Sequence, residues 1–256
     1  MEENIKAYVP KFYLYDENFP CNFDDYIERS KICLEENGKQ VHKDIVKEDL
    51  IHGKYNGKKG FIVPNKEVIQ DKEAPIYYFV REFDNIYTIT YAMFFYLNPG
   101  YIFNLNVQGH YSDWEHVTLE FDYEHKPLRM YFSCHSSLEG RWWAWKDVQL
   151  DINQRPRVYV APKSNANYHR PGFYPRVLGF ANDKTRADGP VWDPTELLLV
   201  ENEYWINYTG YVGCNLKGTK PSVKNISQQY WFRRDSQKSS NSFVQIFLPF
   251  YKLFKR

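Results

Sequence analysis

Alternation of apolar and polar positions dominates the middle of the chain. In the stretch GHYSDWEHVTLEF, Val117, Leu119 and Phe121 fall on one face of an extended strand. The same period places Asp113 and Glu115 on that face. The pattern therefore predicts a strand that directs two carboxylates toward its own core, and a chemical reason for them has to be found.

Other short strands surround this one. Runs rich in β-branched and aromatic residues, bounded by turn formers, predict strands near 11–15, 76–82, 87–96, 114–122, 128–134 and 156–161. From residue 74 onward no helical period lies between them, which favours a mostly β fold, an antiparallel β-sandwich. After about residue 162 the chain is rich in Asn, Asp, Gly and Pro, which predicts long loops.

The N-terminal part predicts a short helical region. Asn22 is suited to cap a helix that has two aspartates in its first turn, and Gly38 is the predicted stop. The polar chain that follows holds the turn signal KYNGKKG, which predicts a hairpin or loop. We expect a single domain, 1–256, made of an N-terminal extension with a helix (1–74), a sandwich core (75–215) and a C-terminal loop with an amphipathic tail (216–256).

The tail, SFVQIFLPFYKLFKR, has aromatic residues at helical spacing with basic residues beyond them. We expect it to dock on the core. An interfacial membrane anchor is the alternative.

Composition and charge exclude some classes of binding partner. Aromatic residues make up 18% of the chain, which favours strands and a large core. The net charge of +1 comes without a long run of one sign, so no nucleic-acid partner is expected. No window is apolar enough for a transmembrane helix, and the acidic N-terminus does not resemble a signal peptide. We expect a soluble protein in the cytoplasm or peripheral to internal membranes.

The cysteines are widely spaced. Cys21, Cys33, Cys134 and Cys214 form no CxxC pair. This spacing argues against a zinc knuckle and against a dense disulfide framework, and it favours reduced thiols.

Two ionised carboxylates on one inward face repel each other and lose hydration. One must take a proton, or a cation or an arginine must neutralise them. His110 adds an imidazole at the same end of the strand, and oxygen-rich ligation with one imidazole suits Ca²⁺, Mg²⁺ or Mn²⁺. The residues alone leave a cation site at His110, Asp113 and Glu115 open beside an acidic cluster that caps turns and pairs with arginines. His116 faces the other way by parity, as a supporting or structural residue.

A longer stretch, ITYAMFFYLNPGYIFNLNVQGHYSDWEHVTLEF, resembles the vacuolar protein sorting-associated protein 62 family and its plant relatives. The opening PKFYLYDENFPCNFDDYI and the blocks MYFSCHSSLEGRWWAW, RPRVYVAPKSNANYHRPG, ANDKT and GPVWDP extend the resemblance from residue 8 to about 215. The heptapeptide GHYSDWE is also similar to the G-H-R-H-D-W-E of necrosis- and ethylene-inducing peptide-like proteins, which are secreted β-sandwich cytolysins. In that family the His, Asp and Glu hold a divalent cation that supports binding to sphingolipid head groups. The resemblance thus implies a cation at His110, Asp113 and Glu115.

The chain also departs from these families. The cytolysins have a further Asp upstream of the heptapeptide, where this chain reads LNPG, and the sorting family's S-H-A-x-Y reads SNANY here. Asn165 in that block can give a carbonyl oxygen but is no imidazole. His135 could face the same cavity, and His169 could compensate only if its loop folds back. Asp183, within ANDKT, is a turn former or a contact of the ligand.

Three functions compete. We expect a non-enzymatic, cation-dependent binding protein, without catalytic residues, that recognises a lipid head group, glycan or protein partner in membrane or vacuolar trafficking. One alternative is a metal-assisted hydrolase with His135 or His169 as acid or base. The other is a structural or self-assembling protein, a homo-oligomer or ordered assembly, that has kept the same sandwich while its site decayed. The altered loop motifs and the near-zero net charge favour this alternative.

Overall fold

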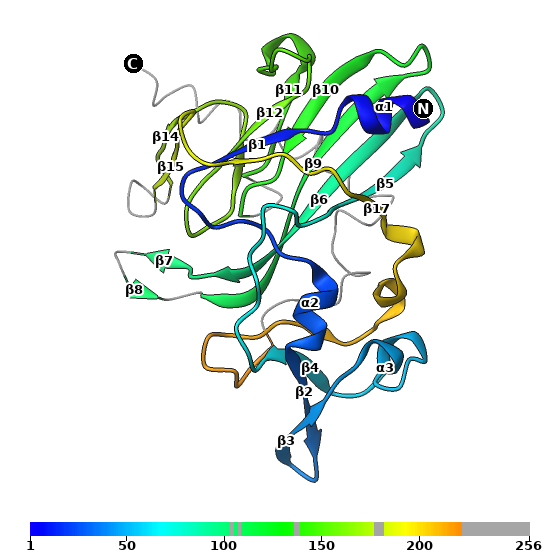
Figure 1. Cartoon of the computed structure of the whole chain (residues 1–256), viewed down its shortest axis with the longest axis vertical. Coiled ribbons are helices and arrows are strands. Elements are labelled where there is room, and N and C mark those ends of the chain that lie inside the picture. The colour runs from blue at the N-terminus through cyan, green and yellow to red at the C-terminus, as the bar shows by residue number, and fades with distance from the viewer. Residues whose placement is uncertain (103–104, 107–108, 136–138, 177–181, 222–256) are drawn as a thin grey trace.

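The computed structural model describes residues 1–102, 105–106, 109–135, 139–176 and 182–221. Over these residues the fold is mostly β, with short helices and long connections, as predicted. Two sheets pack face to face in the upper part of the molecule (Figure 1). This confirms the β-sandwich.

The larger sheet, as far as the described residues show it, has six strands. In sheet order they are β11 (Arg141–Ala144), β10 (Pro127–Phe132), β9 (His110–Asp122), β6 (Ile86–Asn98), β5 (Ile76–Glu82) and β17 (Leu197–Leu199). The facing sheet consists, within the same ranges, of β13 (Asn167–Tyr168), β12 (Arg157–Val160), β1 (Lys11–Leu14) and β16 (Val191–Trp192).

Strand pairing follows the alternation in the sequence. β6 and β9 pair antiparallel from Ile86 opposite Asp122 to Asn98 opposite His110. Two other pairs, β1 with β12 and β5 with β17, are parallel, so the sandwich is mixed rather than wholly antiparallel. Each of these pairs joins strands far apart in sequence, and long connections allow either direction.

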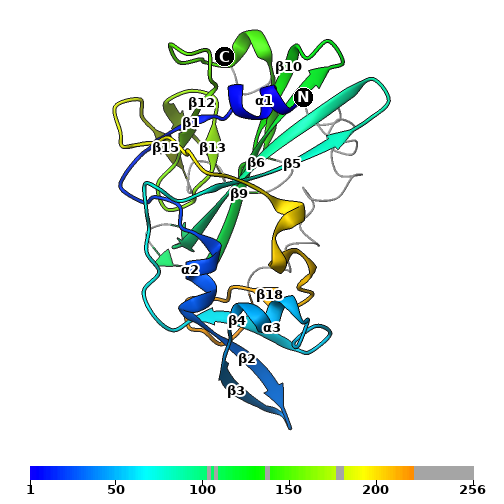
Figure 2. The ribbon, with the colours of Figure 1, turned by 45° about the vertical axis from the view of Figure 1, so that its right-hand side comes forward.

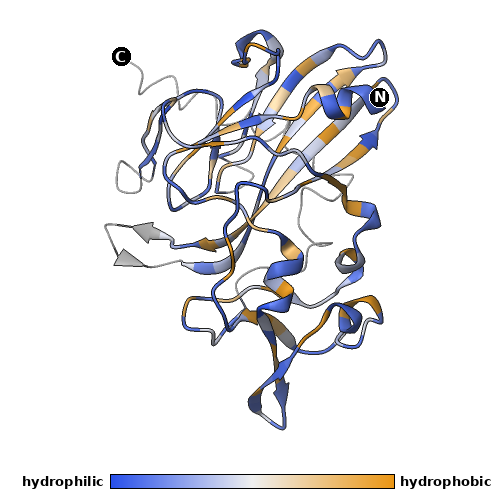
Figure 3. Cartoon of the chain, in the orientation of Figure 1, coloured by the Kyte–Doolittle hydropathy of each residue, from blue (hydrophilic) through white to orange (hydrophobic). Residues whose placement is uncertain are grey.

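The core between the sheets is aromatic and aliphatic. Val117, Leu119 and Phe121 of β9 are fully buried there, together with Phe12 and Trp192 of the facing sheet. Hydrophobic (orange) and hydrophilic (blue) bands alternate along the strands of the larger sheet (Figure 3). Each fully buried apolar side chain of this size contributes about 1.5–3 kcal/mol.

A smaller sheet lies at the other end of the molecule. Its described strands, in order, are β18 (Tyr211–Val212), β4 (Gly60–Pro64), β2 (Ser30–Glu36) and β3 (Lys39–Asp44). Figures 1 and 2 both place the β2–β3 hairpin at the end far from the N-terminal helix α1 (Glu2–Ala7). We call this sheet, with α2 (Phe23–Glu28) and α3 (Lys47–Ile51), the small lobe.

The helix predicted from Asn22 begins as expected but is much shorter. Oδ1 of Asn22 accepts a hydrogen bond of 2.8 Å from the backbone N–H of Asp24, which confirms the cap. The predicted stop at Gly38 is wrong, because α2 ends at Glu28. Asn37 and Gly38 have φ of 51° and 74° and form the tight turn of the β2–β3 hairpin, a geometry that favours Asn-Gly.

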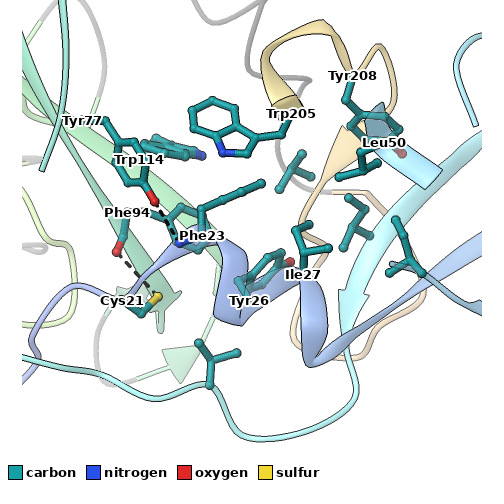
Figure 4. Packing of buried hydrophobic residues seen from close by; sticks show 14 of the residues in the cluster. Cys21, Phe23, Tyr26, Ile27, Leu50, Tyr77, Phe94, Trp114, Trp205 and Tyr208 are labelled. Atoms are coloured by element: carbon teal, nitrogen blue, oxygen red, sulfur yellow. Dashed lines mark hydrogen bonds between the residues drawn. The ribbon is translucent and has the colours of Figure 1, made fainter. Parts of the chain in front are cut away.

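An aromatic cluster ties the small lobe to the larger sheet (Figure 4). The Phe23 ring of α2 lies 5.0 Å from the Phe94 ring of β6 and 4.9 Å from the Trp205 ring, centroid to centroid. The backbone N–H of Phe23 donates to the hydroxyl of Tyr77 on β5, at 3.0 Å. Trp114 of β9 packs into the same cluster. The small lobe is therefore joined to the larger sheet by a hydrophobic cluster of its own, separate from the core between the two sheets.

The remaining described elements are short. They are β7 (Tyr101–Ile102), β8 (Leu105–Asn106), β14 (Gly172–Tyr174), β15 (Asp183–Thr185), η1 (Trp145–Asp147), η3 (Val200–Asn202) and η4 (Tyr204–Asn207). The predicted amphipathic tail falls within 222–256, outside the described residues. Among the helices that the structure describes, none has the length and apolar character needed to cross a membrane.

Candidate functional site

The two carboxylates of β9 point into the sandwich, as the alternation predicted. Asp113 lies opposite Phe95 and Glu115 opposite Met93, and both partners belong to the core between the sheets. Asp113 is 9% exposed and Glu115 is 7% exposed. At the start of the same strand His110 lies opposite Asn98, the last residue of β6.

Asp113 is surrounded by hydrogen-bond donors. Its Oδ2 accepts from the side-chain amides of Asn98 and Asn165, each at 2.9 Å. Its Oδ1 lies 3.5 Å from Nε2 of His110. Burial alone would raise the pKa of Asp113, but the facing imidazole and the two amides outweigh burial and hold the pKa below its ordinary value. Asp113 is therefore the ionised member of the pair.

Glu115 has a different environment. Its Oε2 accepts a hydrogen bond from the Ser133 hydroxyl, and Nδ2 of Asn167 lies 3.5 Å away. Burial, and then the negative charge of Asp113, raise the pKa of Glu115 well above its ordinary value. Of the alternatives that the sequence left open, the described contacts favour a proton on one carboxylate, here Glu115.

A second carboxylate network adjoins the first. Oδ2 of Asp183 lies 2.5 Å from Nε2 of His135 and accepts from the Tyr168 hydroxyl at 2.6 Å. Oδ1 of Asp183 accepts from the Ser164 hydroxyl at 3.1 Å. The segment 164–168 touches both networks. Its Asn165 and Asn167 contact the carboxylates of β9. Its first and last residues donate to Asp183. We call the two networks together the carboxylate cluster.

The fold brings most of the predicted site residues together. His110, Asp113, Glu115, Asn165, His135 and Asp183 all lie in the carboxylate cluster. His116 and His169 do not. The His116 ring stacks on Tyr131 on the other face of β9, and the His169 ring stacks on Trp143 with 3.4 Å between centroids. Burial lowers the pKa of His116 to about 3 and that of His169 to about 4, so both are neutral at pH 7.

Sequence reasoning missed the neutral members of the cluster. Asn98, Ser133, Ser164, Asn167 and Tyr168 each donate to one of its three carboxylates or lie within 3.5 Å of one. For Asn98 a signal was available, since a strand that ends opposite His110 directs its last polar residue to the same place. Nothing in the local pattern around Ser133 distinguishes it from an ordinary strand end.

The donor set decides how well a divalent cation fits. Within the described ranges, no group of three or more His, Cys, Asp or Glu side chains is arranged to hold a metal ion. One oxygen of Asp113 and one of Glu115 already face N–H or O–H donors, which a cation would have to displace. A bound Ca²⁺, Mg²⁺ or Mn²⁺ at His110, Asp113 and Glu115 stays a prediction.

Comparison with known proteins confirms the resemblance. The family model described as "Vacuolar protein sorting-associated protein 62" matches residues 102–212, a stretch that includes the heptapeptide and the segment 164–168. A comparison with curated protein sequences finds no significant match.

Solved structures of necrosis- and ethylene-inducing-type proteins are similar to this chain. "NLPPya in complex with mannosamine" is 14% identical, covers 80% of this chain and 75% of its own, and has a TM-score of 0.42. "Crystal structure of non-toxic HaNLP3 protein" is 14% identical, with coverages of 80% and 78% and a TM-score of 0.43. The structure of Necrosis and Ethylene inducing Protein 2 from the causal agent of cocoa's Witches Broom disease is 13% identical, with coverages of 79% and 76% and a TM-score of 0.43. At these scores the likeness transfers no ligand from those proteins to this chain.

Proposed function

We propose that the chain is a non-enzymatic binding protein whose ligand is a glycan, either free or as the head group of a lipid. The observation that supports this proposal is the asymmetry at Asp113. Its Oδ2 is anchored by two amides, whereas its Oδ1 faces His110 at 3.5 Å, which is longer than an ordinary hydrogen bond. The side chains of His110 and Asp113 are 23% and 12% exposed, so this side of the carboxylate cluster reaches the surface.

A sugar hydroxyl matches this pair of groups. A hydroxyl carries one donor and two acceptor positions, so it can donate to Oδ1 of Asp113 and accept from the His110 ring. The ionised state of Asp113 strengthens the first of these bonds. A buried carboxylate held in one orientation by two side-chain amides is preorganised for recognition.

The thiols argue against a cysteine nucleophile. All four cysteines are buried. Burial raises the pKa of each thiol, for Cys214 to about 12. A thiol with such a pKa is a poor nucleophile near neutral pH.

Calorimetric titration tests the proposal. Glucosamine and mannosamine serve as first probes, followed by vesicles that carry a glycosylated sphingolipid, so that free and lipid-linked sugars are distinguished. We expect saturable binding by the wild type and at least tenfold weaker binding by His110→Ala. His52→Ala removes an exposed histidine of the small lobe and is the control. Equal affinity in His110→Ala, or no binding to any of these probes, would count against the proposal.

A further inference from the structure

We infer that the amides of Asn98 and Asn165 take the place of a divalent cation at Asp113, so that this site works without one. The inference rests on the proposed function for the role of the site. Its test measures metal binding and stability, so it can fail while glycan binding holds, and glycan binding can fail while it holds.

Both amides approach the same carboxylate oxygen. Their nitrogens lie 2.9 Å from Oδ2 of Asp113, a normal hydrogen-bond length. Two N–H donors to one carboxylate oxygen supply the positive electrostatic potential that a cation would otherwise supply. A cation on that oxygen would be repelled by the same N–H groups.

Neither amide can turn its carbonyl oxygen toward a cation without losing a hydrogen bond that the oxygen now accepts. Oδ1 of Asn98 accepts from the backbone N–H of Gly100 at 3.1 Å. If this amide rotated by half a turn, its NH₂ group would face the N–H of Gly100, and two donors would be opposed. The orientation of Asn98 is therefore fixed by a group that can only donate.

A chain of amides fixes Asn165 in the same way. The side chain of Gln70 donates to Asn18 at 2.6 Å, and Asn18 donates to Oδ1 of Asn165 at 2.8 Å. Asn165 in turn donates to Asp113 and is fully buried. Every bond in this sequence points its N–H toward the carboxylate, so that reversing one amide would disrupt its neighbours.

The same arrangement accounts for the departures from the related families. Asn98 belongs to the LNPG stretch, where the cytolysins' further Asp finds no clear equivalent, and Asn165 belongs to the SNANY block. Each position carries a neutral donor, where an added carboxylate or imidazole would have extended a ligand set. At LNPG the missing carboxylate lowers the negative charge around Asp113, and at Asn165 the missing imidazole removes a ligand nitrogen, so both differences weaken the attraction for a cation.

The experiment combines titration calorimetry with thermal unfolding. The purified full chain, treated with EDTA and dialysed, is titrated with CaCl₂, MgCl₂, MnCl₂ and ZnCl₂ beside Asp113→Asn. We expect no saturable heat that depends on Asp113, and the same Tm with and without EDTA. Saturable binding by the wild type that is lost in Asp113→Asn would overturn the inference.

A gain-of-requirement variant provides the second arm. Asn165→Asp replaces an N–H donor by a charged oxygen 2.9 Å from Asp113, so its Tm in EDTA should fall and should recover when Ca²⁺ or Mn²⁺ is added. Asn85→Asp adds the same charge in the exposed turn between β5 and β6 and should show no cation response. If Asn165→Asp does not fold, Asn98→Asp replaces the other donor and takes its place. Both variants folding with a Tm that is lowered but insensitive to either cation would contradict the inference.

Discussion

At the scale of single residues, Asp113 and Glu115 show how neighbours divide the protonation of two carboxylates. Two residues apart on one strand, they differ in the donors that they meet. Asp113 has two amides and an imidazole, and Glu115 has a hydroxyl and one distant amide. Burial penalises a negative charge at both positions, so the carboxylate with more hydrogen-bond donors keeps the charge.

Removing the hydroxyl of Ser133 should destabilise the cluster. Its Oγ donates to Glu115 and accepts from the backbone N–H of His116 at 3.0 Å, so Ser133→Ala removes a hydrogen bond from each of two buried groups. We expect a loss of about 1–3 kcal/mol in the free energy of unfolding, measured by urea denaturation. Ser164→Ala is the matched comparison and should cost less, because Asp183 keeps its contacts with His135 and Tyr168. Equal costs would contradict this account.

Acid should destabilise the fold through its buried histidines. Burial, and then the charge of Arg170, lower the pKa of His169 to about 4. An unfolded histidine titrates near 6.5, so between about pH 6.5 and pH 4 the unfolded chain binds a proton that the folded chain excludes, and stability falls as the pH falls. His169→Phe keeps a ring on Trp143 and should reduce this fall by about 1–2 kcal/mol. Urea denaturation across this range that gives the same slope for both proteins would refute the assignment.

At the scale of elements, the backbone at the start of β9 is hydrogen-bonded to the segment that also pairs with β4 of the small lobe. The carbonyl of Cys214 accepts from the backbone N–H of Tyr111 at 2.8 Å, and the N–H of Gly213 donates to Ile62 of β4 at 3.0 Å. Gly213 has φ of +87°, and a Cβ there would lie 2.1 Å from the carbonyl oxygen of Tyr111. This glycine therefore lets two backbones approach next to His110.

Gly213→Ala should be far more disruptive than an alanine in an ordinary strand. The added methyl group meets backbone atoms and requires a left-handed conformation, so we expect a loss of about 2–4 kcal/mol in the free energy of unfolding. Gly172→Ala is the control, since the nearest atom to its Cβ would be 3.8 Å away. Chemical denaturation of both variants measures the difference. A Gly213→Ala protein as stable as Gly172→Ala would show that the backbones are not held together at this point.

The elements also show what the sequence could predict. Alternation located β5, β6 and β9 and the inward direction of Asp113 and Glu115, because the period of a strand is local information. The helix after Asn22 was extended too far, because Gly38 was interpreted as a helix stop although Asn37-Gly38 is the local signal of a hairpin turn. The pairing of β2 with β4, in contrast, is not local information. The amides around Asp113 come from residues 15 and 52 positions away, and no period predicts such contacts.

At the scale of the whole molecule, the aromatic cluster joins the small lobe to the larger sheet. Phe23 of the small lobe, Trp114 of the larger sheet and Trp205 between them have ring centroids 4.9–5.6 Å apart. Such aromatic pairs contribute about 0.5–1.5 kcal/mol each beyond the area that they bury. Unfolding the small lobe would expose this cluster, so the described lobes should unfold together.

Trp205→Ala should weaken that coupling. We expect the wild type to unfold in one transition that is the same by near-UV and far-UV circular dichroism. The variant should lose about 3–5 kcal/mol, and its two signals should separate, because the cluster no longer bridges the lobes. Two transitions already in the wild type would contradict the coupling of the small lobe to the larger sheet through this cluster.

The most direct test of the central claim is a glycan array probed with the full chain, its Asp113→Asn variant and Asp44→Asn. Asp44 is exposed in the small lobe, so its variant removes the same charge away from the carboxylate cluster. We predict that a defined set of glycans binds the wild type and Asp44→Asn and is lost with Asp113→Asn. A wild type that binds no glycan, or an Asp113→Asn protein that binds the same set, would show that the carboxylate cluster is part of the core and not a binding site.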